Sequence, residues 1–168
     1  RQHFIIKNCL IELTKSDGFD ADFCTGEFSN STFRNTGNDC IDFSGSVVTI
    51  NDIEIINSGD KGVSAGERST LYLKNINIDG ALTGLASKDD SRIEGEKIVV
   101  KNAEVGLAAF QKKPEYDGST MNLENVNYQN IQTLGLVEKG SEVQVAKQLF
   151  KGYQKFDIDA MYARFEKK

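Results

Sequence analysis

The sequence repeats itself with a period of 22 residues, and this period limits the folds that the chain can adopt. A small residue followed by an apolar one recurs at steps of 22, 22, 22, 22 and 29, in Gly18-Phe19, Cys40-Ile41, Gly62-Val63, Gly84-Leu85, Gly106-Leu107 and Gly135-Leu136. A second set of positions, mostly asparagine, recurs at steps of 22, 22, 23, 22 and 28, at Asn8, Asn30, Asp52, Asn75, Lys97 and Asn125. A third set has nearly the same spacing, at Asn35, Asn57, Gly80, Asn102 and Asn130. Independent positions agree on the period, so the chain is an array of one repeated unit.

Each unit carries the pattern of short β-strands. The segments "VVTINDIEIIN", "TLYLKNINIDG" and "MNLENVNYQN" alternate apolar and polar residues and are broken by Asn, Asp, Ser and Gly. Such runs predict short strands joined by turns. A unit of about 22 residues cannot bury a core of its own, so successive units must stack on one another. We therefore predict an all-β fold, a right-handed parallel β-helix (β-solenoid) of about six coils.

The repeated polar residues are expected at the corners of this solenoid. Asparagine tolerates the left-handed conformation that a corner needs, and its amide can bond to the equivalent amide of the next coil. A serine set is expected to mark another corner, at Ser46, Ser69, Ser91, Ser119 and Ser141. The longer coil places its extra residues in "FQKKPEYDG", Phe110 to Gly118. This insertion is either a neutral surface loop or part of a binding face.

The two ends of the array differ. In the tail "DIDAMYARFEKK", apolar residues follow helical spacing, at Ile158, Met161, Tyr162 and Phe165. With Asp157 as N-cap, this pattern predicts an amphipathic helix that closes the C-terminal end. We accordingly divide the chain into a β-helix, residues 1–150, and a linker with a capping helix, residues 151–168. The N-terminus shows no cap, so a larger protein or another chain is expected to cover it.

Composition excludes several classes of function. The 168 residues carry a net charge of −5, and residues 1–60 hold ten Asp and Glu against four Lys and Arg. This balance disfavours nucleic acid as a partner. The only histidine, His3, lies near the terminus, which argues against a histidine-based triad within the chain. Cys9, Cys24 and Cys40 lack zinc-ligand spacing and are expected to be small buried residues rather than nucleophiles.

No apolar run has the length of a membrane span, and the chain shows no signal peptide of its own. We expect a mature or excised piece of a secreted or surface protein.

The units also resemble a known group of proteins. The segments "SDGFDADF", "TFRNTGNDCIDFSGS", "GDKGVSAGERS", "TGLASKDDS" and "VGLAAFQKK" are similar to parallel β-helix regions of secreted bacterial proteins. The similarity covers roughly Ser16 to Ser141 and is greatest to the region that follows the kinase-like domain of CotH-type spore-coat proteins. More distantly, the fold resembles that of pectate-lyase-like enzymes and polysaccharide epimerases. The resemblance implies an extracellular β-helix, and it transfers no phosphoryl-transfer residues because the kinase-like domain is absent from this chain.

Strand alternation places several acidic residues on one outward face. Phe19, Ala21 and Phe23 should point inward, so Asp20 and Asp22 point outward together.

One coil later, Asp42 should stack on Asp20 at about 4.8 Å, where two carboxylates repel each other. A cation, a protonated carboxyl or solvent must relieve this repulsion. Calcium prefers oxygen ligands, so Asp20, Asp22 and Asp42 are the candidate ligands of a Ca²⁺ ion.

The same face should continue into basic residues. Lys61, Lys88 and Arg68 are candidate bases if the protein is a lyase, because enzymes of the lyase type that share this fold remove a proton from a calcium-bound uronate. Lys112 and Tyr116 of the insertion, together with the three aspartates, Lys61 and Lys88, form the candidate ligand-binding face.

Two functions remain open on the sequence alone. The first is an extracellular module that binds polysaccharide or acts as a scaffold for other domains of a larger protein. The second is a calcium-dependent lyase or epimerase that acts on uronate polymers.

Overall fold

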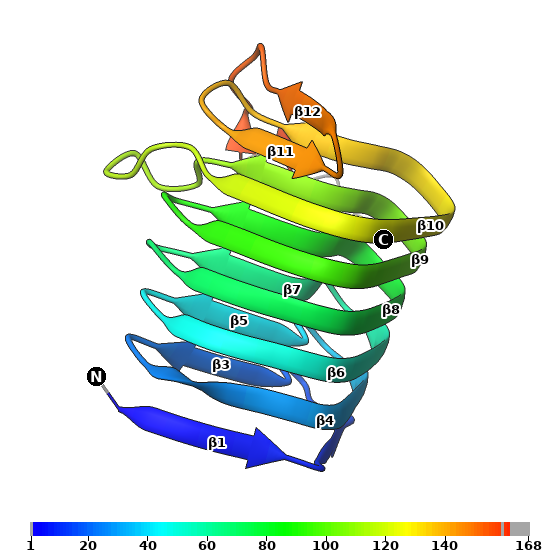
Figure 1. The fold of residues 1–168 in the computed structure, drawn as a ribbon. Coiled ribbons are helices and arrows are strands. Elements are labelled where there is room, and N and C mark those ends of the chain that lie inside the picture. The colour runs from blue at the N-terminus through cyan, green and yellow to red at the C-terminus, as the bar shows by residue number, and fades with distance from the viewer. Residues whose placement is uncertain (1, 159, 162–168) are drawn as a thin grey trace.

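Twelve strands coil into a stack of parallel turns in the computed structural model, which describes residues 2–158, 160 and 161 (Figure 1). The strands are β1 His3–Lys7, β2 Leu10–Glu12, β3 Phe19–Asp22, β4 Thr25–Thr36, β5 Ile41–Ser44, β6 Val47–Ser58, β7 Lys61–Gly66, β8 Thr70–Lys88, β9 Arg92–Phe110, β10 Thr120–Val137, β11 Glu142–Val145 and β12 Gln148–Lys151. The main order is β1-β4-β6-β8-β9-β10-β11-β12, and every pairing except β11 with β12 is parallel. The prediction of an all-β parallel solenoid of about six 22-residue turns is confirmed.

Each coil contributes to three walls. The first wall contains β1 and the opening parts of β4, β6, β8, β9 and β10, and the second wall contains β2 and the middle parts of the same long strands. The third wall contains β3, β5, β7 and the closing parts of β8, β9 and β10. On every wall, equivalent residues of neighbouring coils lie side by side, as Figure 1 shows for the labelled strands. A residue type repeated every 22 positions therefore becomes a row along the stack.

The pairing follows the repeat except in the last full coil. Phe19, Ile41, Val63, Leu85 and Leu107 lie in one row, as the period predicts.

In β10, however, Gly135 pairs with Leu107 and Leu136 pairs with Ala108, so the last step is 28 and not 29 residues. Our alignment of Gly135-Leu136 with Gly106-Leu107 was wrong by one position. Because side chains alternate between faces, this shift turns Leu136 outward instead of into the core.

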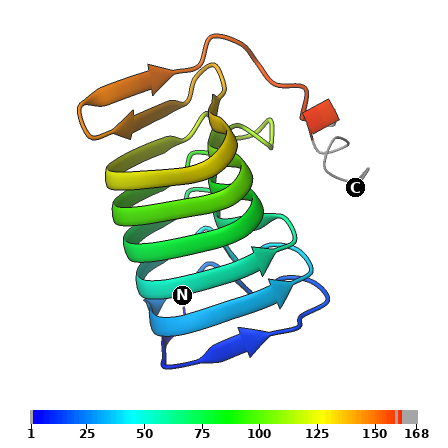
Figure 2. The ribbon, with the colours of Figure 1, turned by 90° about the vertical axis from the view of Figure 1, so that its right-hand side faces the viewer.

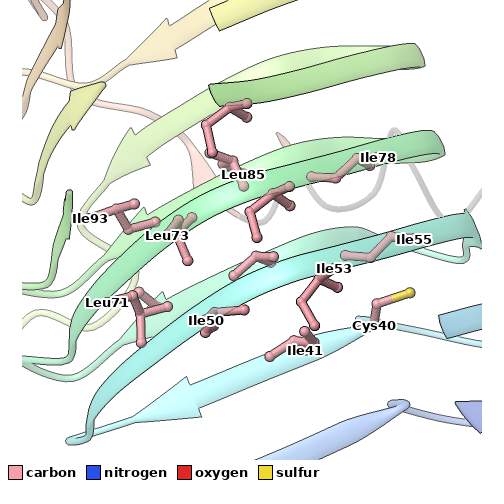
Figure 3. Close-up of a cluster of buried hydrophobic side chains, with 14 of the residues drawn as sticks. Cys40, Ile41, Ile50, Ile53, Ile55, Leu71, Leu73, Ile78, Leu85 and Ile93 are labelled. Carbon is pink, nitrogen blue, oxygen red and sulfur yellow. The ribbon is translucent and has the colours of Figure 1, made fainter. Parts of the chain in front are cut away.

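The core fills the space between the three walls. Figure 3 shows aliphatic side chains from successive coils pointing inward, among them Ile50, Ile53 and Leu73. Phenylalanines stack along the axis near the first coils, where the rings of Phe19 and Phe43 lie 5.7 Å apart. The cysteines are free, and Cys24 and Cys40 are buried as expected. Burial of these apolar rows is the main stabilising force of the stack.

Asparagine occupies the corners for the predicted reason. The residues of both asparagine columns have positive φ, for example 58° at Asn57 and 57° at Asn75. Their amides bond along the stack, from Asn57 Nδ2 to Asn35 Oδ1 at 3.1 Å and from Asn130 Nδ2 to Asn102 Oδ1 at 2.7 Å. The corner conformation and the ladder of amides support each other.

At the serine corner, side-chain hydroxyls accept hydrogen bonds from backbone N–H groups of the neighbouring coil. The amide N–H of Ser46 donates to Ser69 Oγ at 3.1 Å, and the N–H of Ser69 donates to Ser91 Oγ at 3.1 Å. The same bond joins Ser119 to Ser141 at 3.0 Å. The hydroxyls of Ser69, Ser91 and Ser141 are buried, so each satisfies a backbone donor that water cannot reach.

The C-terminal end departs from the prediction. The edge of β11 is paired by the antiparallel strand β12, and no helix is among the elements that the structure describes. The expected capping helix falls largely on residues 162–168, which lie outside the described residues. Asp157, the predicted N-cap, accepts the N–H of Ala160 with its Oδ1 at 2.9 Å. The chain leaves β12 and runs back along the side of the stack (Figure 2).

Candidate functional site

The third wall presents two outward rows, and both match the sequence prediction. The first row holds Asp20, Asp42, Ser64, Ala86 and Ala108, and the second holds Asp22, Ser44, Gly66, Lys88 and Phe110. The register places Asp42 directly beside Asp20 and Ser44 beside Asp22. The face therefore has its acids in the first two coils, as we predicted, and small residues in the middle.

Lys61, a candidate base, is held in ion pairs. It begins β7, is only 6% exposed, and places Nζ 3.3 Å from Asp39 Oδ1. It also pairs with the carboxylate of its neighbour Asp60. The same Asp39 oxygen accepts the backbone N–H of Lys61 at 3.0 Å. Burial raises the pKa of Asp39 to about 6, although the charge of Lys61 opposes this rise.

Lys88, the second candidate base, is also buried and also faces a carboxylate. It is 6% exposed, and its Nζ lies 3.8 Å from Asp42 Oδ1. Its Cε lies 3.5 Å from the point where a side chain on Gly66 would begin, so Lys88 packs directly over this glycine. Burial lowers the pKa of Lys88, the charge of Asp42 opposes this, and the charge of Lys61 adds to the lowering.

Three buried polar atoms of this wall have no hydrogen-bond partner among the residues described. They are Asp42 Oδ1, Ser64 Oγ and Ser87 Oγ. Lys88 therefore neutralises Asp42 through charge at 3.8 Å and not through a hydrogen bond. The carboxylate of Asp42 is also a quarter exposed, so water reaches part of it. The amine of Lys88 and the carboxylate of Asp42 therefore attract each other across the wall without a direct hydrogen bond.

The C-terminal segment covers part of the wall. Phe156, Ile158 and Met161 pack against the outward side chains of Ala108 and Phe110. Leu136, turned outward by the register shift, joins the same cluster. The face that we expected to be open is therefore partly closed, because its last two coils present apolar residues that attract an apolar segment.

Met161 extends this cover to the candidate base Lys61. Both line a cavity of only about 10 Å³, too small to hold more than a single water molecule.

Glu138 fixes this segment, and sequence reasoning missed it. Its side chain is buried and accepts the N–H of Phe156 at 2.9 Å and the N–H of Gln111 at 2.7 Å. Lys155 Nζ lies 3.8 Å from the same carboxylate. No signal in the sequence marks it, since its partners belong to the insertion and the tail and not to the repeat. Asp39, by contrast, precedes Lys61 by one period, so the repeat places the two residues in one column.

The acidic end of the wall remains accessible. Asp20 and Asp22 are exposed, and the pKa of Asp20 is raised by partial burial and then by the charges of Asp42 and Asp22. Within residues 2–158, 160 and 161, no group of three or more His, Cys, Asp or Glu side chains is arranged to hold a metal ion. Calcium binding by Asp20, Asp22 and Asp42 therefore stays a prediction.

The remaining candidates lie at the corner beside the wall. Arg68 Nε is 3.2 Å from Asp90 Oδ2, and its guanidinium carbon lies 5.3 Å from the centre of the Tyr116 ring. The backbone N–H of Lys112 donates to Asp89 Oδ1 at 2.6 Å and anchors the insertion. The charge of Lys112 also contributes to the lowered pKa of Lys88. The structure thus brings Asp42, Lys61 and Lys88 together, with Lys112 nearby, while Arg68 and Tyr116 contact each other.

Comparison of this chain with protein-family models, curated proteins and solved structures finds no match. The functional argument therefore rests on the geometry of the fold. In the described part of the chain, no helix is long and apolar enough to span a membrane.

Proposed function

We propose that this chain is a right-handed β-helix module of a larger extracellular or cell-surface protein, and that it binds polysaccharide or holds neighbouring domains without catalysing a reaction. The observation that carries the proposal is the burial of Lys61 and Lys88 in ion pairs. A base must approach the proton that it removes, within hydrogen-bond distance or through one water molecule. Both amines instead face carboxylates of their own wall. The charged groups of this wall thus stabilise one another, and neither amine is positioned to take a proton from a substrate.

The architecture supports a binding or scaffold role. A solenoid presents long, flat walls whose rows repeat at every coil, and such surfaces suit extended partners. Amide and serine ladders at the corners bond each coil to the next, so the walls keep their register along the stack. A polymer with a regular repeat can contact several coils in the same way.

Two assays separate the functions. The protein is incubated with a uronate polymer, with and without Ca²⁺, and the ultraviolet absorbance of an unsaturated product is followed. Retention on immobilised polysaccharides is measured in parallel. We expect retention without product. A product that forms in proportion to protein concentration would overturn the proposal, and absence of both retention and product would leave the scaffold role alone.

A calcium-dependent lyase or epimerase is the second candidate, and one observation favours it. Burial raises the pKa of Asp39 and lowers that of Lys88, and perturbed groups of this kind gather at catalytic sites. In this alternative Asp20, Asp22 and Asp42 hold Ca²⁺, and Lys61, Lys88 or Arg68 is the base. The melting temperature at millimolar Ca²⁺ tests the metal, because an ion that binds only the folded state raises it. An unchanged melting temperature would exclude this candidate.

A further inference from the structure

The first wall carries a groove that none of the candidate residues above belongs to. Its volume is about 410 Å³, within the usual range of about 300–1,000 Å³ for ligand sites. The lining comes from β6, β8, β9 and β10, and comprises Asn51, Tyr72, Leu73, Lys74, Glu94, Gly95, Glu96, Asn122 and Glu124. Four successive coils thus build one surface on the side of the stack.

Tyr72 is the aromatic residue of the groove. It lies between Thr49 and Glu94 in an outward row, and it is 47% exposed. In the part of the chain that the structure describes, no other ring and no cation stacks on it. Its ring therefore offers a free apolar face beside polar neighbours, which is the combination that pyranose rings use for stacking.

The polar side chains around Tyr72 supply both donors and acceptors. Asn122 Nδ2 donates to Glu94 Oε2 at 3.0 Å, and Lys74 Nζ lies 3.6 Å from Glu96 Oε2. These contacts orient the side chains and leave further oxygen lone pairs and N–H groups unused. Glu124 has no ion pair or hydrogen bond within the described residues. A ligand rich in hydroxyl groups can bond to all of these groups, because a hydroxyl both donates and accepts.

The charge of the groove selects against acidic ligands. One lysine faces three glutamates among the lining residues, and 1 − 3 gives a net charge of −2. A uronate chain would place further carboxylates against them, and like charges repel. Arg92, beside the groove, already pairs with Glu94 and is not free to bind an acidic sugar.

We infer that this groove binds a neutral glycan, with one pyranose ring stacked on Tyr72 and its hydroxyls bonded to the surrounding carboxylates and amides. The inference rests on the proposed binding function and names its site and ligand class. Equivalent positions recur at about 4.8 Å along the wall, a step close to the length of one sugar ring. A glycan running along the stack therefore meets Tyr72 from β8 and then the Glu94 and Asn122 side chains from β9 and β10.

Calorimetric titration with neutral glucan and mannan hexasaccharides tests the site, with a hexagalacturonate as the acidic counterpart. We expect a neutral hexasaccharide to bind and the acidic one to bind at least about tenfold more weakly. Tyr72→Ala should weaken binding about tenfold or more, whereas Tyr72→Phe keeps the ring and should stay within a few fold of the original. Glu124→Gln should weaken it a few fold. Glu54→Gln, an exposed carboxylate on the second wall, is the matched control and should have no effect.

The possible outcomes distinguish an error in the proposed site from an error in the proposed binding function. Tighter binding of the acidic hexasaccharide would overturn the inference about ligand class. Binding of a neutral glycan that survives Tyr72→Ala and Glu124→Gln would overturn the site but leave the binding function intact. If no glycan binds at all, both the inference and the polysaccharide function fail. All four variants alter exposed side chains, so unchanged melting temperatures should confirm that they fold.

Discussion

Lys88 reaches past Gly66 to within 3.8 Å of Asp42, so an amine in β8 neutralises a carboxylate in β5 although β7 lies between them. The side chain of Lys88 packs directly over Gly66 on its way to the carboxylate. The pair links two coils that are separated by a third, and it withdraws Lys88 from solvent. The arrangement explains how the chain accommodates an acidic row on a wall whose middle coils are buried.

Replacing one member of this ion pair should destabilise the protein more than replacing both. We expect Asp42→Asn to lower the free energy of unfolding by about 2–3 kcal/mol, since Lys88 is then left buried without its carboxylate. The double variant with Lys88→Met should recover to within about 1 kcal/mol of the original protein. Urea denaturation of the four proteins of the cycle measures the coupling. Additive losses in the double variant would show that the two side chains do not interact. As a control, Lys74→Met breaks the exposed pair with Glu96 and should cost less than about 0.5 kcal/mol.

Loss of the contact between Phe156 and Phe110 should expose Lys61, which the C-terminal segment covers. Phe156 packs against Phe110 with ring centres 6.4 Å apart, and Met161 follows it over the wall. In Phe156→Ala we expect Lys61 to react faster with an acetylating reagent, measured by mass spectrometry relative to the exposed Lys74. Tyr153→Ala is the control, because Tyr153 is 88% exposed and its loss should change nothing. If Lys61 reacts at the same rate in Phe156→Ala and in the original protein, the C-terminal segment does not shield it.

The buried carboxyl of Asp39 should make stability fall as the solution becomes less acidic. Its pKa is about 6 in the folded protein, above the ordinary value of 3.8. Between these two values the folded state binds more protons than the unfolded state, so the free energy of unfolding decreases as pH rises. We expect a loss on the order of 2–3 kcal/mol across this window from this group. Because other carboxyls titrate there too, the measured quantity is the difference from Asp39→Asn, which keeps an acceptor for the Lys61 N–H and should lack this slope. An identical pH profile in both proteins would refute the assignment.

Replacement by alanine should lower the stability at Ser69 and leave it unchanged or raise it at Ser64. Ser69 Oγ accepts the backbone N–H of Ser46, so Ser69→Ala leaves a buried donor unpaired and should cost about 1–3 kcal/mol. Ser64 is equally buried, but its Oγ has no hydrogen-bond partner among the described residues. Ser64→Ala should therefore be neutral or stabilising. Thermal denaturation of both variants decides this, and a similar loss in the two would count against the serine ladder.

Conformation and hydrogen bonding can be separated at the asparagine corner. Asn57 has φ of 58° and donates to Asn35. Asn57→Gly keeps the corner conformation and loses only the amide, whereas Asn57→Ala loses both. We expect the alanine variant to be less stable than the glycine variant by about 1 kcal/mol. If alanine proves the more stable, the left-handed corner is not what selects this residue.

The candidate site could be assembled from the sequence only in part. The period placed Asp42 beside Asp20 and Lys61 above Asp39, because each pair joins residues one coil apart. It did not show that Lys88 turns back towards Asp42, since the direction of a flexible side chain depends on the surfaces and charges around it. Nor did it reveal Glu138, whose contacts connect the insertion to the tail and occur once in the chain.

The sequence by itself determined the solenoid, because a repeated pattern of strand and corner residues has a single way to bury its apolar rows. The alternation within each strand also determined that Asp20, Asp22 and Asp42 face outward. It was wrong for Phe23, which was expected inside but follows the end of β3 with a positive φ and is 59% exposed. The tertiary structure alone decided the register of β10, where Leu136 turns outward, and the course of the segment from Phe156 to Met161 over the third wall. It also decided the pairing of β11 with β12 at the C-terminal end. The physical reason is the same in each case: contacts at one period are encoded in every repeat, whereas contacts outside the period depend on the surfaces that the finished stack presents.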